Sequence, residues 1–363
     1  MKCGIVGLPN VGKSTLFNCL SNAKALAANY PFATIEPNVG TIPVPDDRLE
    51  ALEQIVNPEK VQSATVEIVD IAGLVKGASK GEGLGNKFLA NIRETDAIIH
   101  VLRCFENENI THVDGSIDPI RDKETIDMEL QLKDIETIEK RINTQKRQAK
   151  SGDKAAVKLV ELYETLHEHL MKGESARSCE LTEGELELVS DLHLITAKPV
   201  LYVCNVDEQT LKQGNDMVKK VEALAESEQA LSIILAAGLE ADINELDDYE
   251  ERQIFLEDAG LKEPGVNKLI RIAYDLLNLQ TYFTAGVKEV RAWTIKKGST
   301  APQAAGVIHT DFEKGFIRAE VIAYEDYVEL KSETACKDAG KLSIEGKEYI
   351  VKDGDVMHFR FNV

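Results

Sequence analysis

The chain has 363 residues, and its 42 Lys and Arg residues against 62 Asp and Glu residues give a formal net charge of −20. This length provides for roughly two or three domains with buried cores. The sequence shows no secretory signal and no run near the ~18 apolar residues of a membrane span, so we expect a cytoplasmic protein with no membrane partner. The acidity excludes indiscriminate binding to polyanions, and we expect no DNA partner, although a local basic face can still bind RNA at physiological salt.

The N-terminal segment contains a phosphate-binding loop. Residues Gly7 to Ser14 read Gly-Leu-Pro-Asn-Val-Gly-Lys-Ser and fit the pattern G-x-x-x-x-G-K-[ST]. The apolar run Cys3 to Gly7 leads into this loop and a helical stretch follows from Thr15. This order of strand, loop and helix argues against an ordinary glycine turn. The chain is therefore predicted to bind a nucleoside triphosphate.

Each part of this loop has a chemical task. Gly7 and Gly12 let backbone N–H groups turn toward the phosphates, and the start of the helix adds its partial positive charge. Lys13 is predicted to bridge the β- and γ-phosphates as a catalytic residue, and the Ser14 hydroxyl to bind Mg²⁺. The predicted nucleotide-binding residues of this segment are Asn10, Val11, Gly12, Lys13, Ser14 and Thr15.

Two further segments are typical of nucleotide switches. Thr34 lies between the first helix and the next strand, where a hydroxyl can bind Mg²⁺ in the triphosphate state. Asp70 ends an apolar run and opens the sequence Asp-Ile-Ala-Gly73, so Asp70 is predicted to bind in the Mg²⁺ shell and the Gly73 N–H to bind the γ-phosphate. The glycine-rich stretch from Leu74 to Gly85 is predicted to be ordered by the γ-phosphate, with a flexible linker as the alternative.

Hydrolysis is predicted to be slow. Leu74 stands where many such enzymes have a water-orienting Gln, and its side chain has no hydrogen-bonding group. His112, in the loop after a predicted strand, is a candidate catalytic residue that positions the water, with an ordinary exposed loop histidine as the alternative. Asn10 is a candidate to help bind a K⁺ ion beside the phosphates.

The first 280 or so residues read as an α/β domain with an insertion. Apolar runs at 3–8, 64–71, 97–105, 199–206 and 231–237 alternate with helical stretches. This alternation predicts a doubly wound, mostly parallel sheet. The long interval between the third and fourth runs is helical over about 120–148 and 155–171. These two stretches predict an inserted, projecting coiled-coil hairpin.

Charge is unevenly distributed along the chain. From Lys133 to Lys158 the predicted hairpin has eight basic and four acidic residues, whereas Glu240 to Glu263 has ten acidic and two basic residues. The basic segment is predicted to contact RNA, with a solvated helix face as the alternative, and the acidic one to face away from RNA.

The segment after the fourth strand is predicted to read the base. A guanine reader has Asn-Lys-x-Asp, but this chain has Asn205-Val-Asp-Glu208. Glu208 is longer than Asp, Val206 removes the lysine stem, and Asn205 with nearby backbone can satisfy the donor and acceptor of adenine. We therefore favour ATP over GTP. Further predicted base contacts are the backbone at Ala237 and the ring of Phe105, for which core packing is the alternative.

From residue 279 on, the chain reads as a separate α+β module. Strands are predicted at 292–295, 316–322, 349–351 and 356–361, and a short helix at about 302–308. The basic residues Lys288, Arg291, Lys296, Lys297, His309, Lys314 and Arg318 form a second candidate surface for RNA.

Taken together, the motifs closely resemble the YchF or Obg-like ATPase family over the full chain. The resemblance rests on Gly7 to Ser14, Asp70-Ile-Ala-Gly-Leu74, Asn205 to Glu208, the inserted hairpin and the terminal Asp353-Gly-Asp-Val-Met-His-Phe-Arg-Phe361. It implies a P-loop ATPase that associates with ribosomes or ribosomal RNA, with a P-loop domain at 1–118 and 198–278, the hairpin domain at 119–197 and a ubiquitin-like β-grasp (TGS) module at 279–363.

Other functions remain open from the sequence. These are a GTPase of the Obg-related class, an RNA- or ribosome-binding protein whose nucleotide is mainly structural, and a small-metabolite kinase. The Asp70 to Gly73 segment disfavours the kinase.

Overall fold

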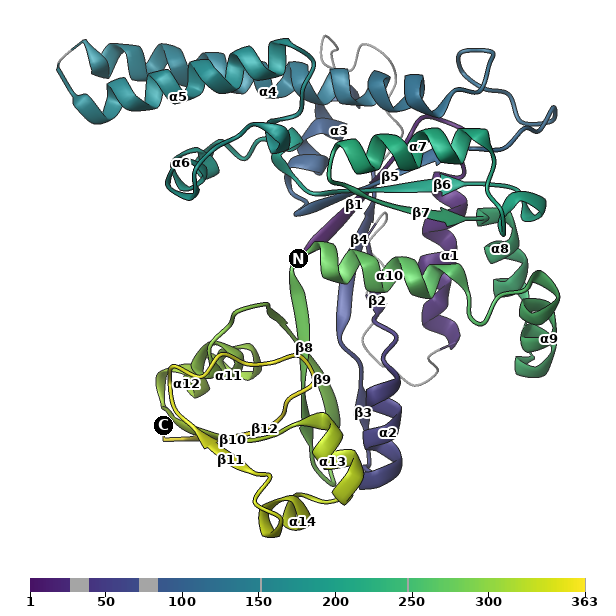
Figure 1. Ribbon diagram of the computed structural model, residues 1–363, viewed down its shortest axis with the longest axis vertical. Helices are drawn as coiled ribbons and strands as arrows, with labels where there is room; N and C mark the ends of the chain where they lie inside the picture. The colour runs from purple at the N-terminus through teal and green to yellow at the C-terminus, as the bar shows by residue number, and fades with distance from the viewer. Residues whose placement is uncertain (27–38, 72–83, 151, 247, 363) are drawn as a thin grey trace. The chain divides into compact units, whose positions relative to one another are not determined.

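The computed structural model describes residues 1–26, 39–71, 84–150, 152–246 and 248–362 (Figure 1). The chain divides into two compact units, one made mainly of Met1–Ala23 and Glu67–Val266 and the other mainly of Thr41–Val66 and Asn267–Val363. The three domain limits expected from the sequence remain a prediction. Within the described ranges, no helix combines the length and apolar character that crossing a bilayer requires.

The first unit is built on a six-stranded sheet in the order β2-β4-β1-β5-β6-β7. β1 pairs in parallel with β4 and β5, and β6 pairs in parallel with β5 and β7. Every residue of β5 and β6 is buried, which is why the sequence shows continuous apolar runs there instead of alternation. The predicted doubly wound α/β fold is confirmed. The strands are β1 (Lys2–Val6), β2 (Val39–Pro43), β4 (Thr65–Asp70), β5 (Ala97–Arg103), β6 (Val200–Asn205) and β7 (Leu231–Leu235).

Helices cover this sheet, with α7 in front of the strands and α1 behind them in Figure 1. Leu16 and Leu20 of α1 are fully buried. Glu240 of α8 is also buried, and it accepts hydrogen bonds from the N–H groups of Gly265 (2.7 Å) and Val266 (3.3 Å) at the start of α10. One acid of the acidic stretch is thus used inside the fold. The helices of this unit are α1 (Lys13–Leu26), α3 (Leu84–Arg93), α7 (Asp216–Ser227), α8 (Ala237–Glu245) and α9 (Tyr249–Ala259), while α10 (Gly265–Leu276) begins in this unit and continues in the second.

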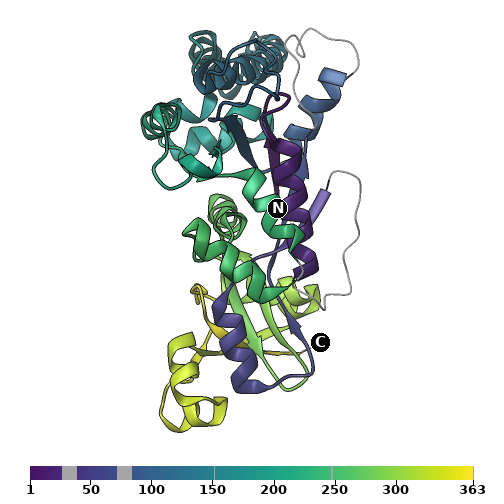
Figure 2. The same ribbon diagram turned by 90° about the vertical axis from the view of Figure 1, so that its right-hand side faces the viewer.

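The inserted segment is a hairpin of two long helices, α4 (Pro119–Ala149) and α5 (Lys154–Met171), which confirms the predicted helical stretches. The helices run side by side in Figure 1 and are seen nearly end-on in Figure 2. Asp118 and Asp153 accept hydrogen bonds from the first N–H groups of the two helices, so each helix has an N-cap. Apolar residues of both helices form one buried cluster that includes Ile138, Ile142, Leu162, Tyr163 and Leu166.

The return from the hairpin to the sheet is held by a buried carboxylate. Asp134 of α4 is fully buried and accepts hydrogen bonds from Ile195 N (2.8 Å), Thr196 N (2.7 Å) and Thr196 Oγ1 (2.7 Å). Burial raises the pKa of Asp134 although these donors oppose that rise. The return contains the short elements η1 (Ala176–Ser178), α6 (Glu183–Val189), η2 (Ser190–Leu192) and η3 (Ile195–Ala197).

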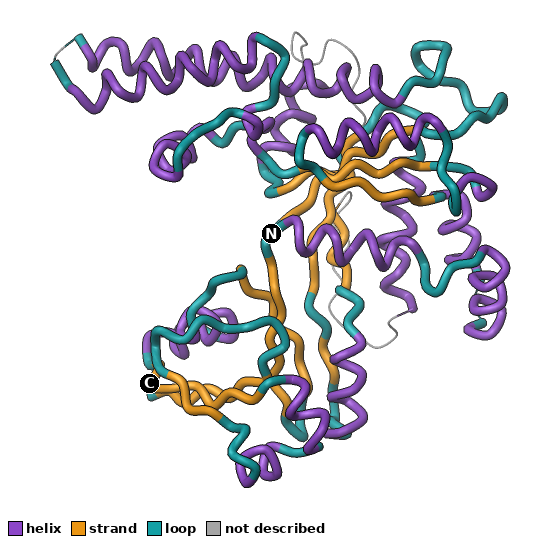
Figure 3. Tube along the Cα trace, in the orientation of Figure 1, coloured by secondary structure: helices purple, strands orange, loops and turns teal. Residues whose placement is uncertain are grey.

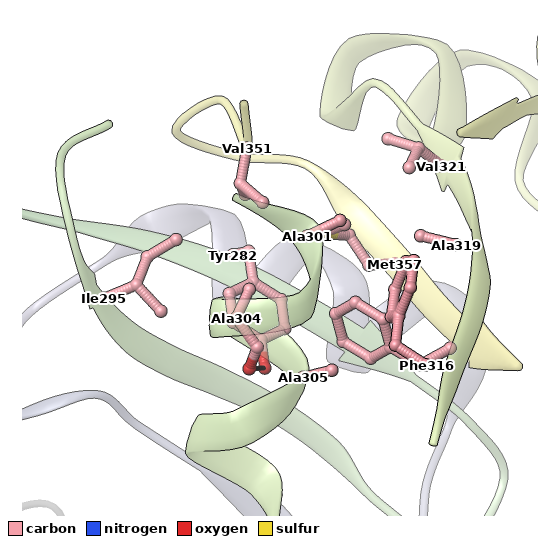
Figure 4. Close-up of a cluster of buried hydrophobic side chains, with 11 residues drawn as sticks. Tyr282, Ile295, Ala301, Ala304, Ala305, Phe316, Ala319, Val321, Val351 and Met357 are labelled. Atoms are coloured by element: carbon pink, nitrogen blue, oxygen red, sulfur yellow. Dashed lines mark hydrogen bonds between the residues drawn. The ribbon is translucent and has the colours of Figure 1, made fainter. Parts of the chain in front are cut away.

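The second unit has its own six-stranded sheet in the order β11-β10-β12-β8-β9-β3, drawn in orange in Figure 3. Tyr282 lies at the centre of its core, where its hydroxyl donates to the carbonyl of Ala304 (3.0 Å) (Figure 4). Its ring meets that of Phe359 edge to face. The strands are β3 (Val61–Gln62), β8 (Leu279–Ala285), β9 (Val290–Lys296), β10 (Phe316–Ile322), β11 (Ser343–Glu345) and β12 (Val356–Phe361). The helices are α2 (Asp47–Val56), α11 (Ala301–Ile308), α12 (Thr310–Lys314), α13 (Tyr324–Leu330) and α14 (Glu333–Asp338).

One strand prediction in this unit is wrong. Residues 349–351 form no strand of the sheet, since Ile350 makes only an isolated bridge to Thr300. Two backbone hydrogen bonds join this segment to Ser299 and to Ala301, the first residue of α11. Its partner is therefore a three-residue segment that turns into a helix, which is too short to continue a ladder.

Candidate functional site

The phosphate loop joins β1 to α1 at the carboxyl edge of the parallel sheet. Asn10 and Gly12 both have left-handed backbone conformations, with φ of 64° and 93°. A Cβ on Gly7 would lie 2.9 Å from the carbonyl oxygen of Val101 on β5, so only glycine lets the loop pass this close to the sheet. Helix α1 begins at Lys13, within the last two residues of the loop motif, which places the positive end of its dipole at the loop.

Lys13 and Asp70 form an ion pair. Lys13 Nζ donates to Asp70 Oδ1, and the two side chains are only 9% and 16% exposed. The predicted phosphate-binding cation at the start of α1 and the predicted Mg²⁺-shell carboxylate at the end of β4 thus neutralise each other. Ser14 and Thr15 are exposed at the start of α1. Hydroxyl and carboxylate oxygens are the hard donors that Mg²⁺ prefers, and Ser14 follows the residue that pairs with Asp70, so the two residues fit the ion.

Asn205, at the end of β6, connects the phosphate loop to the start of α8. Its Nδ2 donates to the carbonyl of Val11 (2.8 Å), and its Oδ1 accepts from the N–H of Ala237 (2.9 Å). The side chain is 3% exposed. The amide therefore braces two predicted nucleotide-binding segments, and its predicted contact with adenine stays a prediction.

The other predicted base-side residues lie in different environments. Val206 is buried and its N–H donates to Leu235 O (2.9 Å), whereas Glu208 is exposed in η4 (Glu208–Thr210). Asp207, between them, accepts hydrogen bonds from the N–H (2.9 Å) and the hydroxyl (2.7 Å) of Thr210. Its carboxylate is thus engaged in the turn, and Glu208 is the carboxylate of this segment that faces solvent.

Arg103, the last residue of β5, fixes the loop that carries His112. Its guanidinium is buried and donates to the carbonyls of Phe105 (3.2 Å), Asn107 (3.1 Å) and Ile110 (2.9 Å). The same group lies 4.7 Å from the centre of the Phe105 ring. Phe105 thus packs on Arg103 in this structure, and its contact with a base stays a prediction.

The phosphate loop touches the residue next to His112. Asn10 Nδ2 donates to the carbonyl of Thr111 (3.1 Å), so the two loops border each other. This contact engages the amide nitrogen of Asn10. Its predicted K⁺ contact, which needs the amide oxygen, is untested by this bond.

His112 is held away from solvent. Its Nε2 lies 2.7 Å from Oδ2 of Asp122 in the first turn of α4, and its Nδ1 accepts from the N–H of Asp114 (3.1 Å). The exposed fraction is 7% for His112 and 1% for Asp122. Although a ligand atom of Asp114 also lies within 4.8 Å, Arg121 Nη2 donates to Asp122 (3.1 Å). We therefore interpret this group as a hydrogen-bonded cluster, and the expectation of an ordinary exposed histidine does not fit it.

Some predicted residues lie outside the described part of the chain. These are Thr34, Gly73 and Leu74, with most of the glycine-rich stretch.

Two residues of this site were not predicted from the sequence. Arg103 stands in an otherwise apolar run, and this single cation is the signal that would have identified it. A buried charge in a central strand needs hydrogen-bond partners nearby, so its presence indicates a polar loop at the end of the strand. Asp122 stands ten residues after His112, a separation that has no sequence signature.

Two family models match the chain. One is described as "50S ribosome-binding GTPase" and covers residues 2–134, and the other is YchF-GTPase_C, described as "Protein of unknown function (DUF933)", over residues 279–362. Full-length relatives include two proteins named "Ribosome-binding ATPase YchF". The one from Haemophilus ducreyi is 59% identical over 362 residues, covering 100% of this chain and 99% of its own. The one from Bacillus subtilis is 55% identical over 365 residues, with 100% of both chains covered.

A solved structure agrees over almost the whole chain. It is titled "Structure of the Schizosaccharomyces pombe YchF GTPase", has 39% sequence identity and superimposes with a TM-score of 0.90, covering 99% of this chain and 97% of that one.

Proposed function

The chain belongs to the YchF family of ribosome-binding ATPases, and from this premise we propose that it is a slow ATP-driven switch. It binds ATP at the phosphate loop, hydrolyses it to ADP and phosphate, and binds ribosomes differently in the two nucleotide states. Because a ribosome-binding protein works where ribosomes are, we expect it in the cytoplasm.

The ion pair between Lys13 and Asp70 is the observation that carries this proposal. Both groups are needed elsewhere once a nucleotide is bound, the lysine at the β- and γ-phosphates and the carboxylate in the Mg²⁺ shell. Their mutual neutralisation keeps two poorly exposed charges paired before ATP arrives, and separating them costs less when each gains a new partner. When bound, Mg²⁺ would neutralise phosphate charge and be held by Ser14 and Asp70, with Thr34 as a further proposed ligand.

The base preference is proposed from the segment after β6. Asn205 is engaged with Val11 and Ala237, and Asp207 with Thr210, so neither is arranged to accept from both N–H groups of guanine. Glu208, longer by a methylene, replaces the carboxylate that a guanine reader uses. We therefore propose ATP over GTP. GTP is the competing substrate, because a matching family model and the yeast structure carry the word GTPase.

For water positioning we propose His112, which is a neighbour of the phosphate loop through the contact between Asn10 and Thr111. Because Nδ1 accepts a hydrogen bond, the proton of a neutral ring is on Nε2, where it points to Asp122. His112 must leave Asp122 before Nε2 can meet a water at the γ-phosphate. This requirement fits a slow intrinsic rate, within a few orders of magnitude of the ~10⁻⁴ s⁻¹ of an unassisted switch.

Nucleotide titration tests the site. ATP, GTP and their diphosphates are titrated into the purified protein, with Lys13→Ala as the control. We expect ATP to bind more tightly than GTP and Lys13→Ala to lose most of the affinity for ATP. Tighter binding of GTP would contradict the base assignment.

Ribosome co-sedimentation in the apo, ADP and ATP-analogue states tests the switch. We expect the bound fraction to depend on the nucleotide. Equal pelleting in all three states would favour a ribosome-binding protein whose nucleotide is structural.

A further inference from the structure

A basic groove lies between the end of α3 and one face of α4. Its volume is about 440 Å³. It is lined by Arg93 of α3 and by six residues of α4, namely Lys133, Glu136, Thr137, Lys140, Arg141 and Thr144. All these side chains are charged or carry a hydroxyl. The groove thus offers hydrogen-bond donors, and none of its lining residues is apolar or aromatic, so its apolar surface belongs to the carbon stems of polar side chains.

The spacing of the α4 residues explains why they share a face. Lys133, Thr137, Lys140 and Thr144 follow one another at steps of four, three and four residues, which return to the same side of a helix. Ile138 and Ile142 belong to the buried hairpin cluster and so define a different face. The groove is therefore a regular polar face of α4, separate from the contact with α5.

The charges of the groove are only partly neutralised. Lys133 forms an ion pair with Glu136 (2.9 Å), the one acid in the lining. Arg141 lies 3.3 Å from Asp191, and the side chains of this second pair are about half exposed. Lys140 is in none of the ion pairs found among the described residues. Four cations against Glu136, Asp191 and the buried Asp134, which interacts electrostatically with Arg93, leave a net positive charge in and around the groove.

Arg93 adds unused donors to the groove wall. Its Nη2 donates to Thr137 Oγ1 (3.1 Å), but its buried Nε has no hydrogen-bond partner within the described residues. The bond to Thr137 holds the guanidinium in place, and a planar guanidinium suits an oxygen-rich anion.

A neighbouring hollow of about 380 Å³ makes a useful contrast. It shares Arg93 but is also lined by Glu94, Asp96 and apolar residues such as Leu186 and Val189. There the two carboxylates balance the two cations Arg93 and Lys198. The groove on the α4 side of Arg93 has one acid in its lining and is therefore the more favourable of the two for an anion.

We propose that this groove binds the phosphate backbone of RNA. The proposal rests on the proposed ribosome-binding function and specifies one surface for it. Lys133 and Lys140 are two helical turns apart, about 10 Å along the axis, so the groove suits a chain of phosphates better than a single anion. A protein partner would need an apolar or aromatic anchor at the centre of its contact, which this lining does not provide.

The test uses the full-length protein and a fluorescently labelled single-stranded RNA oligonucleotide, with affinity measured by anisotropy at several salt concentrations. The groove variant is Arg93→Ala with Lys140→Ala. The control is Lys146→Ala with Lys158→Ala, which removes the same charge from the hairpin outside the groove, since Lys146 pairs with Glu164 of α5 (2.7 Å). We expect about a tenfold or greater loss for the groove variant, with a salt slope lower by ~1 to 2, and less than a twofold loss for the control.

A second variant separates binding from folding. Lys140 is exposed, so Lys140→Glu should leave the far-ultraviolet circular dichroism spectrum and the affinity for ATP unchanged. The affinity for RNA should fall by at least tenfold. Unchanged RNA affinity in this variant, or equal losses in groove and control pairs, would overturn the proposal.

Ribosome pelleting distinguishes the partners. Loss of ribosome binding in the groove variant with normal RNA affinity would assign the groove to an acidic protein and overturn the RNA assignment. If wild-type protein bound RNA through the groove but neither ATP nor ribosomes, the groove would stand and the proposed function would fail.

Discussion

Nε2 of His112 lies 2.7 Å from Oδ2 of Asp122, and both side chains are almost completely buried. Through this bond the loop beside the phosphate site is attached to the first turn of α4, the helix that also forms the hairpin. The proposed water-positioning residue is thus restrained by the element that we propose contacts RNA.

Replacing His112 or Asp122 should have opposite effects on turnover. His112→Ala removes the proposed water-positioning group and should lower the rate of ATP hydrolysis about 100-fold with a smaller change in KM. Asp122→Asn keeps the shape but weakens the charge-assisted bond, so His112 is released more often and turnover should rise severalfold. Steady-state phosphate release measures both, and equal losses in the two variants would show that Asp122 supports the active form of His112 and does not restrain it.

Asn205→Ala should weaken both the fold and the nucleotide site. The change leaves the buried Val11 carbonyl and Ala237 N–H without their partner, at a cost of about 1 to 3 kcal/mol in the free energy of unfolding, and it frees the phosphate loop. Asn215→Ala is a matched control, because Asn215 also braces buried backbone, from Cys104 O (2.7 Å) to Val218 N (3.0 Å). Urea unfolding should detect both changes, whereas ATP titration should detect only Asn205→Ala.

Gly12→Ala should abolish ATP binding. A Cβ at this position would lie 2.2 Å from Asn205 Nδ2, and φ of +93° is unfavourable for alanine. Gly152 has a similar φ of +89°, but a Cβ there would lie in open space. Gly152→Ala is therefore a control that introduces the same backbone strain without a steric clash. We expect calorimetric titration to show no ATP binding for Gly12→Ala and wild-type affinity for Gly152→Ala. Comparable affinities would mean that the loop relaxes around the methyl group.

His100 should make the protein sensitive to mild acid. The pKa of this β5 histidine is lowered to about 4, mainly by burial, with the cations Lys123 and Arg177 contributing and the carboxylates Asp127 and Glu228 opposing. The unfolded chain binds a proton below pH ~6.5 whereas the folded chain does so only near pH 4, so stability falls as the pH drops between these values. From pH 7 to pH 5 the loss from this group should be about 2 kcal/mol.

Replacing His100 with Phe tests this assignment. His100→Phe keeps a ring against Tyr202, whose centre lies 5.8 Å away, and cannot titrate. Urea denaturation at pH 7 and pH 5 should give a difference smaller by about 2 kcal/mol in the variant. An unchanged difference would show that other groups cause the acid sensitivity.

Asp134→Ala should loosen the return of the hairpin. Three buried donors at Ile195 and Thr196 lose their acceptor, at an expected cost of about 3 kcal/mol. Asp153→Ala removes only an exposed N-cap of α5, at about 1 kcal/mol. Urea unfolding compares the two costs, and limited proteolysis should cut near Thr196 only in Asp134→Ala. Equal costs would show that Asp134 acts as no more than a local cap.

Most of the fold could be predicted from local patterns. β5 and β6 are continuous apolar runs because both faces are covered, and α4 and α5 show the helical period directly. The failed strand at 349–351 has similar apolar residues, but whether they form a ladder depends on the partner, and the partner here is the short segment from Ser299 to Ala301, which turns into a helix. Whether a short segment forms a strand depends on pairing partners that are distant in the sequence, and hydrophobic periodicity does not reveal those partners.

The candidate site was predictable where its parts are contiguous. The phosphate loop is a single sequence segment, and Asp70 is recognisable because it ends a strand. The two bonds of Asn205 reach residues 194 and 32 positions away, so its bracing role follows only from the folded sheet. The same holds for His112, whose loop position indicated exposure although Asp122 draws it inside.

Helix α4 is one unbroken helix of 31 residues, and three features are fixed along it: Asp122 at the His112 loop, Asp134 at the hairpin return and Lys140 in the basic groove. Each added residue turns a helix by roughly 100°. One residue inserted between Asp122 and Asp134 would thus rotate the groove away from Arg93. Residues inserted at the tip between α4 and α5 would leave the three features in the same relative orientation about the helix axis. Length variants of this protein should therefore be tolerated at the tip and excluded from the first half of α4.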